Sequence, residues 1–142
     1  MRRWSSLLAI GIALFLASCG AKPIELDVAP GGYASVQIEV SLDEGYKFSG
    51  KEAIYATAPE LEGINWIARE AVSGGSPVKM ELSASPNAAA GTRRGKLELT
   101  VTFCEKGGTL CLIRQRLIPL KVSVSPNGAA RAAAVYSLKI KP

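Results

Sequence analysis

Apolar and polar residues alternate along most of this chain. Every second residue is apolar between residues 24 and 28 and again between residues 34 and 40. Alternation with a period of two is typical of half-buried strands, because successive side chains point to opposite faces of a sheet. Similar or short apolar runs predict further strands at residues 52–57, 64–68, 78–84, 95–104, 111–124 and 132–140.

Residues that favour turns separate these segments. Clusters rich in Gly, Pro, Asn or Asp lie at residues 29–32, 43–45, 73–77, 106–108 and 125–128. About eight short strands without long helical segments predict an all-β fold, an immunoglobulin-like antiparallel β-sandwich. Residues 60–72 leave two alternatives open, since their apolar positions come near a helical spacing while residues 64–67 also suit a strand. We favour the strand.

The first twenty residues follow a different pattern. Arg2 and Arg3 precede an apolar run from residue 7 to residue 16, and small residues then precede Cys19. A basic start, a short apolar run and a small-residue cleavage site are typical of a secretory signal peptide. The apolar run is shorter than the roughly 20 residues that a membrane-spanning helix needs.

Leu-Ala-Ser-Cys at residues 16–19 resembles the lipobox of bacterial lipoproteins. The resemblance implies cleavage before Cys19 and acylation of that cysteine, so that the chain is anchored to a lipid bilayer. An ordinary cleaved signal and an uncleaved anchor are the alternatives. We expect a signal peptide at residues 1–18, a lipidated tether at residues 19–23 and a β-sandwich domain at residues 24–142. The resemblance implies a cell-envelope location. Gly20 is not the aspartate that marks inner-membrane retention of such lipoproteins, so the resemblance implies the outer membrane, facing the periplasm, if the source has two membranes.

Size and charge constrain the remaining domain. Without residues 1–18 the chain has 124 residues, which is enough for one hydrophobic core. Loss of Arg2 and Arg3 lowers the formal net charge from +5 to about +3. This excess is too small to favour nucleic acid as a partner.

The chain contains no histidine. This excludes Ser-His and Cys-His nucleophiles, histidine-ligated zinc and the commonest general base. Acidic residues at positions 43–44, 60 and 62 lack a recognisable catalytic or calcium-binding pattern and fit solvated loops. We therefore assign no catalytic residue, cofactor or metal ligand.

Two cysteines, Cys104 and Cys111, remain when Cys19 is acylated. An even number of cysteines in an oxidising compartment favours a disulfide. The pair is either a structural cross-link or a redox pair. A reactive thiol needs a nearby cation, and the charge of Lys106 is offset by Glu105.

A resemblance to a known family rests on residues 95–104, 111–112, Gln115 and residues 120–122. This pattern resembles the C-terminal β-sandwich of proteins that join a thioredoxin-like domain to an NHL-repeat propeller. The Gly-Tyr-Lys turn at residues 45–47 is similar to one in the same module. More distantly, both patches resemble the immunoglobulin-like N-terminal domain of the thiol:disulfide interchange protein DsbD. This chain has neither a thioredoxin Cys-x-x-Cys nor propeller repeats.

Two functions remain, of which the resemblance to the DsbD domain supports only the second. The first is a non-enzymatic binding or structural module that holds an envelope protein near the membrane. The alternative is thiol-disulfide exchange through Cys104 and Cys111 with a thioredoxin-like partner.

The register of the hairpin around these cysteines poses a conflict. If Cys104 faces Cys111 without irregularity, Arg114 and Arg116 lie on the apolar face of residues 97–103. Because burial of an unpaired guanidinium costs several kcal/mol, we expect a β-bulge after Cys111 and a second break near Pro119, with both arginines in solvent.

Aromatic side chains are a final group of candidates. They could form a binding face or fill the core, and we favour the core. They are Tyr33, Tyr46, Phe48, Tyr55, Trp66 and Tyr136.

Overall fold

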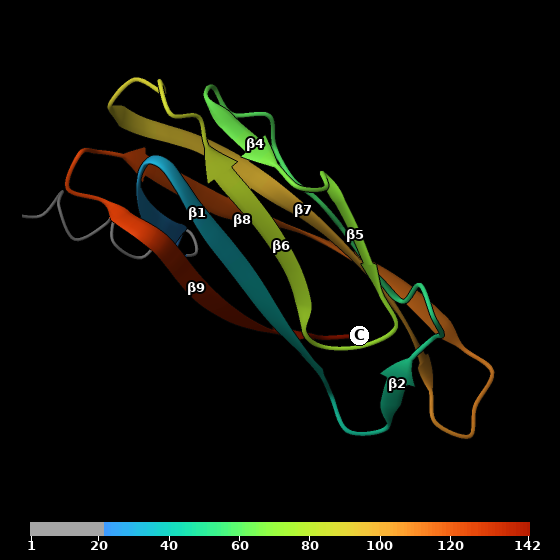
Figure 1. Ribbon diagram of the computed structural model, residues 1–142. Helices are drawn as coiled ribbons and strands as arrows, with labels where there is room; N and C mark the ends of the chain where they lie inside the picture. The colour runs from blue at the N-terminus through green and yellow to red at the C-terminus, as the bar shows by residue number, and fades with distance from the viewer. Residues whose placement is uncertain (1–21) are drawn as a thin grey trace, which may run out of the picture.

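The computed structural model describes residues 22–142 (Figure 1). The described part contains nine strands and no helix, which confirms the all-β class. The strands are β1 (Ile24–Leu42), β2 (Tyr46–Phe48), β3 (Ile54–Thr57), β4 (Ile64–Trp66), β5 (Glu70–Ser73), β6 (Val78–Ala84), β7 (Gly91–Glu105), β8 (Cys111–Val124) and β9 (Ala129–Ile140). The ambiguous segment at residues 60–72 contributes to β4 and β5, so the strand interpretation is confirmed. The expected signal peptide and Cys19 lie outside the described residues.

Strand β1 has two arms that run in opposite directions. Residues 24–28 pair parallel with β8. Residues 33–42 pair parallel with β9, and residues 33–38 also pair antiparallel with β6. The chain turns between the arms, where the register shifts and Gly31 has a φ of +78°. Only glycine adopts such a φ without steric cost. In Figure 1 this turn joins the blue start of β1 to its long teal arm.

The two arms of β1 connect two layers of one curled sheet. The first layer holds the short arm of β1 followed by β8, β7, β3 and β5, with β2 also paired to β7. The second layer holds β4, β6, the long arm of β1 and β9. The fold is therefore sandwich-like, as expected. It is mixed rather than purely antiparallel, because the reversal of β1 makes each arm run in the same direction as its neighbour, β8 or β9.

The core lies between the layers and is apolar throughout the described residues. The alternation of the sequence fixes which face is buried, since every second residue is buried in β6, in residues 24–28 and 34–40 of β1, and in residues 97–103 of β7. The largest fully buried side chains are Phe103, Ile38, Ile54, Leu82, Leu97, Leu99, Ile118, Leu120 and Ile140.

The expected bulges in β8 are absent, and that prediction is wrong. The β7–β8 ladder runs without a register shift from Cys104–Cys111 to Gly91–Val124, and it places Arg114 opposite Val101 and Arg116 opposite Leu99. Ile113 and Leu117, which a bulge after Cys111 would have turned toward the core, are 62% and 58% exposed.

The hydrogen-bond pattern explains why Pro119 does not break the ladder. The Glu105 N–H donates to the Leu110 carbonyl at 2.9 Å, so this is a hydrogen-bonded pair. Hydrogen-bonded and non-hydrogen-bonded pairs alternate along an antiparallel ladder. Pro119, opposite Lys96, then falls at a non-hydrogen-bonded site. Its missing N–H would have pointed away from β7, so no ladder bond is lost.

The same alternation explains how the arginines are tolerated. The carbonyls of Ile113 and Gln115 point away from β7, toward the free edge of β8. Arg114 Nη1 donates to the Ile113 carbonyl at 3.0 Å, and Arg116 Nη1 donates to the Gln115 carbonyl at 2.8 Å. Both arginines are half-buried. Their aliphatic stems lie on the inner side of β8 while the charged groups turn around its edge, so no guanidinium is buried unpaired.

Candidate functional site

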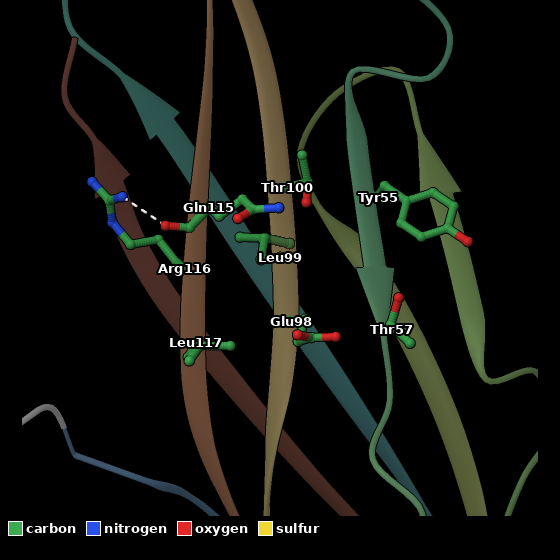
Figure 2. Close-up of a pocket in the computed structure, with 8 residues that line it drawn as sticks. All are labelled: Tyr55, Thr57, Glu98, Leu99, Thr100, Gln115, Arg116 and Leu117. Carbon is green, nitrogen blue, oxygen red and sulfur yellow. Dashed lines mark hydrogen bonds between the residues drawn. The ribbon is translucent and has the colours of Figure 1, made fainter.

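The outer face of the first layer carries two rows of side chains from three adjacent strands. Tyr55, Thr100 and Gln115 form one cross-strand row, and Thr57, Glu98 and Leu117 form the next. Side chains directly opposite one another in a sheet share a face. Strands β3, β7 and β8 therefore present these six side chains together (Figure 2).

A pocket of about 550 Å³ lies over these rows. Its lining also includes Leu99 and Arg116. Figure 2 shows the Arg116 guanidinium on the far side of β8, bonded to the Gln115 carbonyl, and the Leu99 side chain belongs to the core. The volume lies within the roughly 300–1,000 Å³ typical of ligand pockets. The pocket is thus large enough for a small ligand or for a few side chains of a partner.

Exposed apolar side chains flank the pocket. We call Tyr55, Val72, Ile113 and Leu117 the outer-face patch. Tyr55 and Val72 are 39% and 47% exposed and face each other across β3 and β5. Ile113 and Leu117 lie on β8 at either side of Gln115. Exposed apolar side chains that gather on one face, among polar neighbours, mark interaction sites more often than isolated ones do.

Tyr55 is held in place by a carboxylate. Its hydroxyl donates a hydrogen bond to Glu70 Oε1, from β5. This hydrogen bond to a charged acceptor, followed by desolvation and the negative charge of Glu70, raises the pKa of Tyr55 above its ordinary value. The phenol therefore keeps its proton to a higher pH than a free tyrosine does, and its hydrogen bond to Glu70 orients it at the rim of the pocket.

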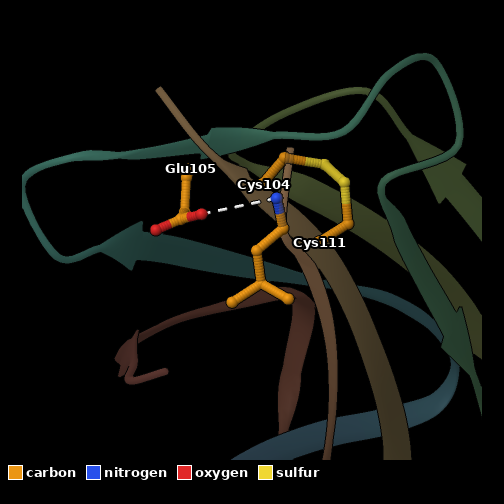
Figure 3. Close-up of a disulfide and its surroundings, with 4 residues drawn as sticks. Cys104, Glu105 and Cys111 are labelled. Carbon is orange, nitrogen blue, oxygen red and sulfur yellow. Dashed lines mark hydrogen bonds between the residues drawn. A yellow bond between two sulfur atoms is a disulfide. The ribbon is translucent and has the colours of Figure 1, made fainter. Parts of the chain in front are cut away.

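The expected disulfide between Cys104 and Cys111 is present and lies on the same outer face. The two Cα atoms are 4.0 Å apart, which fits the close approach at a non-hydrogen-bonded pair. Cys111 is exposed and Cys104 is half-buried. In the adjacent turn, the Leu110 N–H donates to Glu105 Oε1 at 3.3 Å (Figure 3). The disulfide therefore closes the tip of the β7–β8 hairpin.

A cation that sequence spacing did not indicate stands beside this disulfide. Lys47 of β2 pairs with Cys104 across the β2–β7 ladder, so the two side chains share the outer face. The neighbours of Lys47 point inward, where the Tyr46 ring meets Phe103 edge to face at 5.5 Å. The sequence suggested only Lys106, because residues 46–48 were not predicted as a strand.

The aromatic residues divide between core and surface. As expected, most pack against the core: Tyr46, Phe48, Trp66 and Tyr136. Tyr33 and Tyr55 are exposed instead. Position 55 could have been assigned to the outer face, since it lies between the apolar residues Ile54 and Ala56 in a predicted strand. Its partners Glu70 and Val72 could not have been assigned to this face, because β5 was not predicted as a separate strand.

Among residues 22–142, no group of three or more His, Cys, Asp or Glu side chains is placed to hold a metal ion. The same residues contain no helix that is long and apolar enough to cross a membrane. Comparison with known proteins found no matching family model and no matching curated sequence.

Proposed function

We propose that this protein is a lipid-anchored lipoprotein of the cell envelope whose β-sandwich acts as a non-enzymatic binding module. The Leu-Ala-Ser-Cys motif at residues 16–19 supports the anchor. The observation that carries the binding role is the pocket on the outer face, framed by Tyr55 and Leu117.

The composition of this face favours a protein partner. Tyr55 and Leu117 offer apolar contact area, while Glu98, Thr100 and Gln115 supply hydrogen-bonding groups between them. Interface hot spots combine an aromatic anchor with nearby polar contacts in this way. A partner segment with a small apolar side chain for the pocket, and a donor for Glu98, fits the chemistry of the site.

Site-specific photo-crosslinking in intact envelopes tests the binding role. A photoreactive side chain at Gln115 samples the pocket, and the same side chain at Lys79, exposed on β6 in the other layer, is the matched control. We expect a discrete adduct from position 115 that is lost when Leu117→Glu is added. Equal adducts from both positions, or an adduct insensitive to Leu117→Glu, would contradict the assignment of this face.

A second candidate function is thiol-disulfide exchange. It is favoured by the exposure of Cys111 and by Lys47 beside Cys104. A partner thiolate would attack the Cys111 sulfur, and the disulfide bond would break to release the Cys104 thiolate, which a nearby cation stabilises. A second partner thiol would then resolve the mixed disulfide, leaving the pair reduced and the partner oxidised.

The reduction potential separates the two roles of the cysteines. A potential above about −200 mV fits exchange, whereas one below about −300 mV fits a structural cross-link. Equilibration of the purified protein with glutathione or dithiothreitol buffers gives this value. Lys47→Gln is the informative variant, since loss of the cation alters the potential if the thiolate of Cys104 is stabilised by it.

A further inference from the structure

We propose that the free edge of β8 lies against an anionic phospholipid surface, where Lys22, Arg114 and Arg116 contact the headgroup phosphates. The inference rests on the proposed acylation of Cys19 and adds an orientation to it. It follows from where the tether joins β1 and from the chemistry of the β8 edge beside that point.

The chain enters the sandwich alongside β8. Ile24, the first residue of β1, pairs with Leu120, and the two strands run parallel. Moving back along β1 toward Lys22 therefore moves back along β8 toward Arg116. Four residues lie between Cys19 and Ile24, so the two Cα atoms are five residue steps apart. Because an extended chain spans at most about 3.5 Å per residue, an acyl anchor on Cys19 lies within about 17 Å of Ile24. The bilayer surface is then within reach of the β8 edge.

The two arginines give this edge a positive charge. Each guanidinium has five N–H donors, and within residues 22–142 each makes one hydrogen bond, to a carbonyl of its own strand. Neither is in an ion pair with another described residue. The remaining donors match the oxygens of a phosphate, which guanidinium groups bind in a bidentate manner.

The carboxylate closest to the chain entry is already paired with a cation. Glu25, which follows the chain entry, forms an ion pair with Lys121 at 3.2 Å. The arginine side chains also occupy outward-facing carbonyls of β8, and Pro119 lacks an outward N–H, so the edge is a poor template for another strand. This edge is charged, pairs poorly with another strand and lies beside the tether. It therefore fits a layer of lipid headgroups better than a strand from a protein partner.

The orientation has a consequence for the outer-face patch. When the β8 edge contacts the membrane, the face of the sheet stands upright on the bilayer. The pocket over Tyr55 and Gln115 then opens sideways and stays accessible to a partner.

Arginine-selective labelling of the full, lipidated protein tests this orientation. The protein is reconstituted in vesicles of phosphatidylcholine alone or mixed with phosphatidylglycerol, and phenylglyoxal adducts are quantified by mass spectrometry. Arg69 is the internal control, because it is exposed and also donates to a backbone carbonyl, that of Ala58 at 3.2 Å. We expect labelling of Arg114 and Arg116 to fall roughly fivefold in the mixed vesicles, with Arg69 unchanged.

A charge-matched pair of double variants provides the second readout. The amine reactivity of Lys22 should fall in the mixed vesicles for wild type and for Lys51→Gln with Lys106→Gln. That protection should be lost for Arg114→Gln with Arg116→Gln.

The outcomes distinguish the orientation from the anchor. If the protein floats with the vesicles but Arg114 and Arg116 label like Arg69, or are equally protected in phosphatidylcholine, the orientation is wrong and the anchor stands. If the protein does not float with either vesicle, the lipid anchor itself is wrong and the orientation falls with it.

Discussion

At the scale of single residues, the Tyr55–Glu70 hydrogen bond predicts a measurable titration. The carboxylate raises the pKa of Tyr55 above the ordinary value of about 10. In Glu70→Gln the negative charge is gone, so we expect the pKa of Tyr55 to fall toward that value. NMR titration of ring-labelled tyrosine measures it, with Tyr55→Phe to assign the signal. An unchanged Tyr55 pKa in Glu70→Gln would show that the hydrogen bond is not formed in solution.

The sign of the linked stability effect follows from the same shift. A phenol whose pKa is higher in the folded state holds its proton longer there than in the unfolded chain. The stabilisation from this pair is thus present below the unfolded pKa and is lost as the pH rises through the folded pKa. Because the pair is at the surface, the effect on unfolding should be small.

Arg114 and Arg116 show a limit of inference from single residues. Their period-two spacing placed them on the apolar face, and the cost of burying a guanidinium argued for a bulge. The structure keeps the spacing and avoids the cost, because long arginine stems carry the charges to the strand edge. Whether a guanidinium can reach a free strand edge depends on whether another strand pairs with the far side of β8. That pairing cannot be read from the local sequence.

At the scale of elements, the disulfide should stabilise the β7–β8 hairpin modestly. Removal of both thiols in Cys104→Ala with Cys111→Ala opens a ring of about eight residues, which corresponds to at most about 2.5 kcal/mol in the loop-entropy model. Denaturant unfolding measures the loss, and wild type with a reductant is the matched comparison. A loss well above this value would indicate that the bond also holds packing elsewhere.

The turn between β8 and β9 makes a second prediction. A Cβ on Gly128 would lie 2.4 Å from the backbone carbon of Val28, where β1 begins its reversal. Gly128→Ala should therefore cost about 1–3 kcal/mol or more, since backbone must move. At Gly75 the nearest atom to such a Cβ is 3.8 Å away, on the Phe48 ring. Gly75→Ala should change the unfolding free energy by less than about 0.5 kcal/mol, and equal effects would contradict the packing at this turn.

Sequence reasoning identified the long strands and the short strands β3 and β4, but it missed β2 and β5. Strands β6 and β7 have enough alternating positions for the period to be unmistakable. Strands β2 and β5 have three and four residues. Their place in the sheet comes from pairing with β7 and β3, which is a tertiary effect. The candidate site depends on these short strands, since they supply Lys47, Glu70 and Val72.

At the scale of the whole molecule, the all-β, sandwich-like fold could be predicted but its topology could not. The pattern of residues 24–28 and 34–40 identified two strands and a Gly-rich turn. It could not show that the arms of β1 enter different layers and run parallel to β8 and β9, because strands so far apart in sequence pair through the fold as a whole.

The proposed tether predicts that Cys19→Ala releases or mislocalises the protein without unfolding the domain, since residues 19–23 precede the first core position, Ile24. Fractionation of cells after a salt wash measures the location, and circular dichroism of the β-sandwich reports folding. Retention of the variant in the membrane pellet would count against the lipoprotein assignment.

Mass spectrometry of the N-terminal peptide from membrane-extracted protein tests the proposed lipid anchor most directly. We predict a mature chain that begins at Cys19 and carries the mass of acyl chains on that residue. A mature chain that begins elsewhere, or an unmodified Cys19, would contradict the membrane-tethered function.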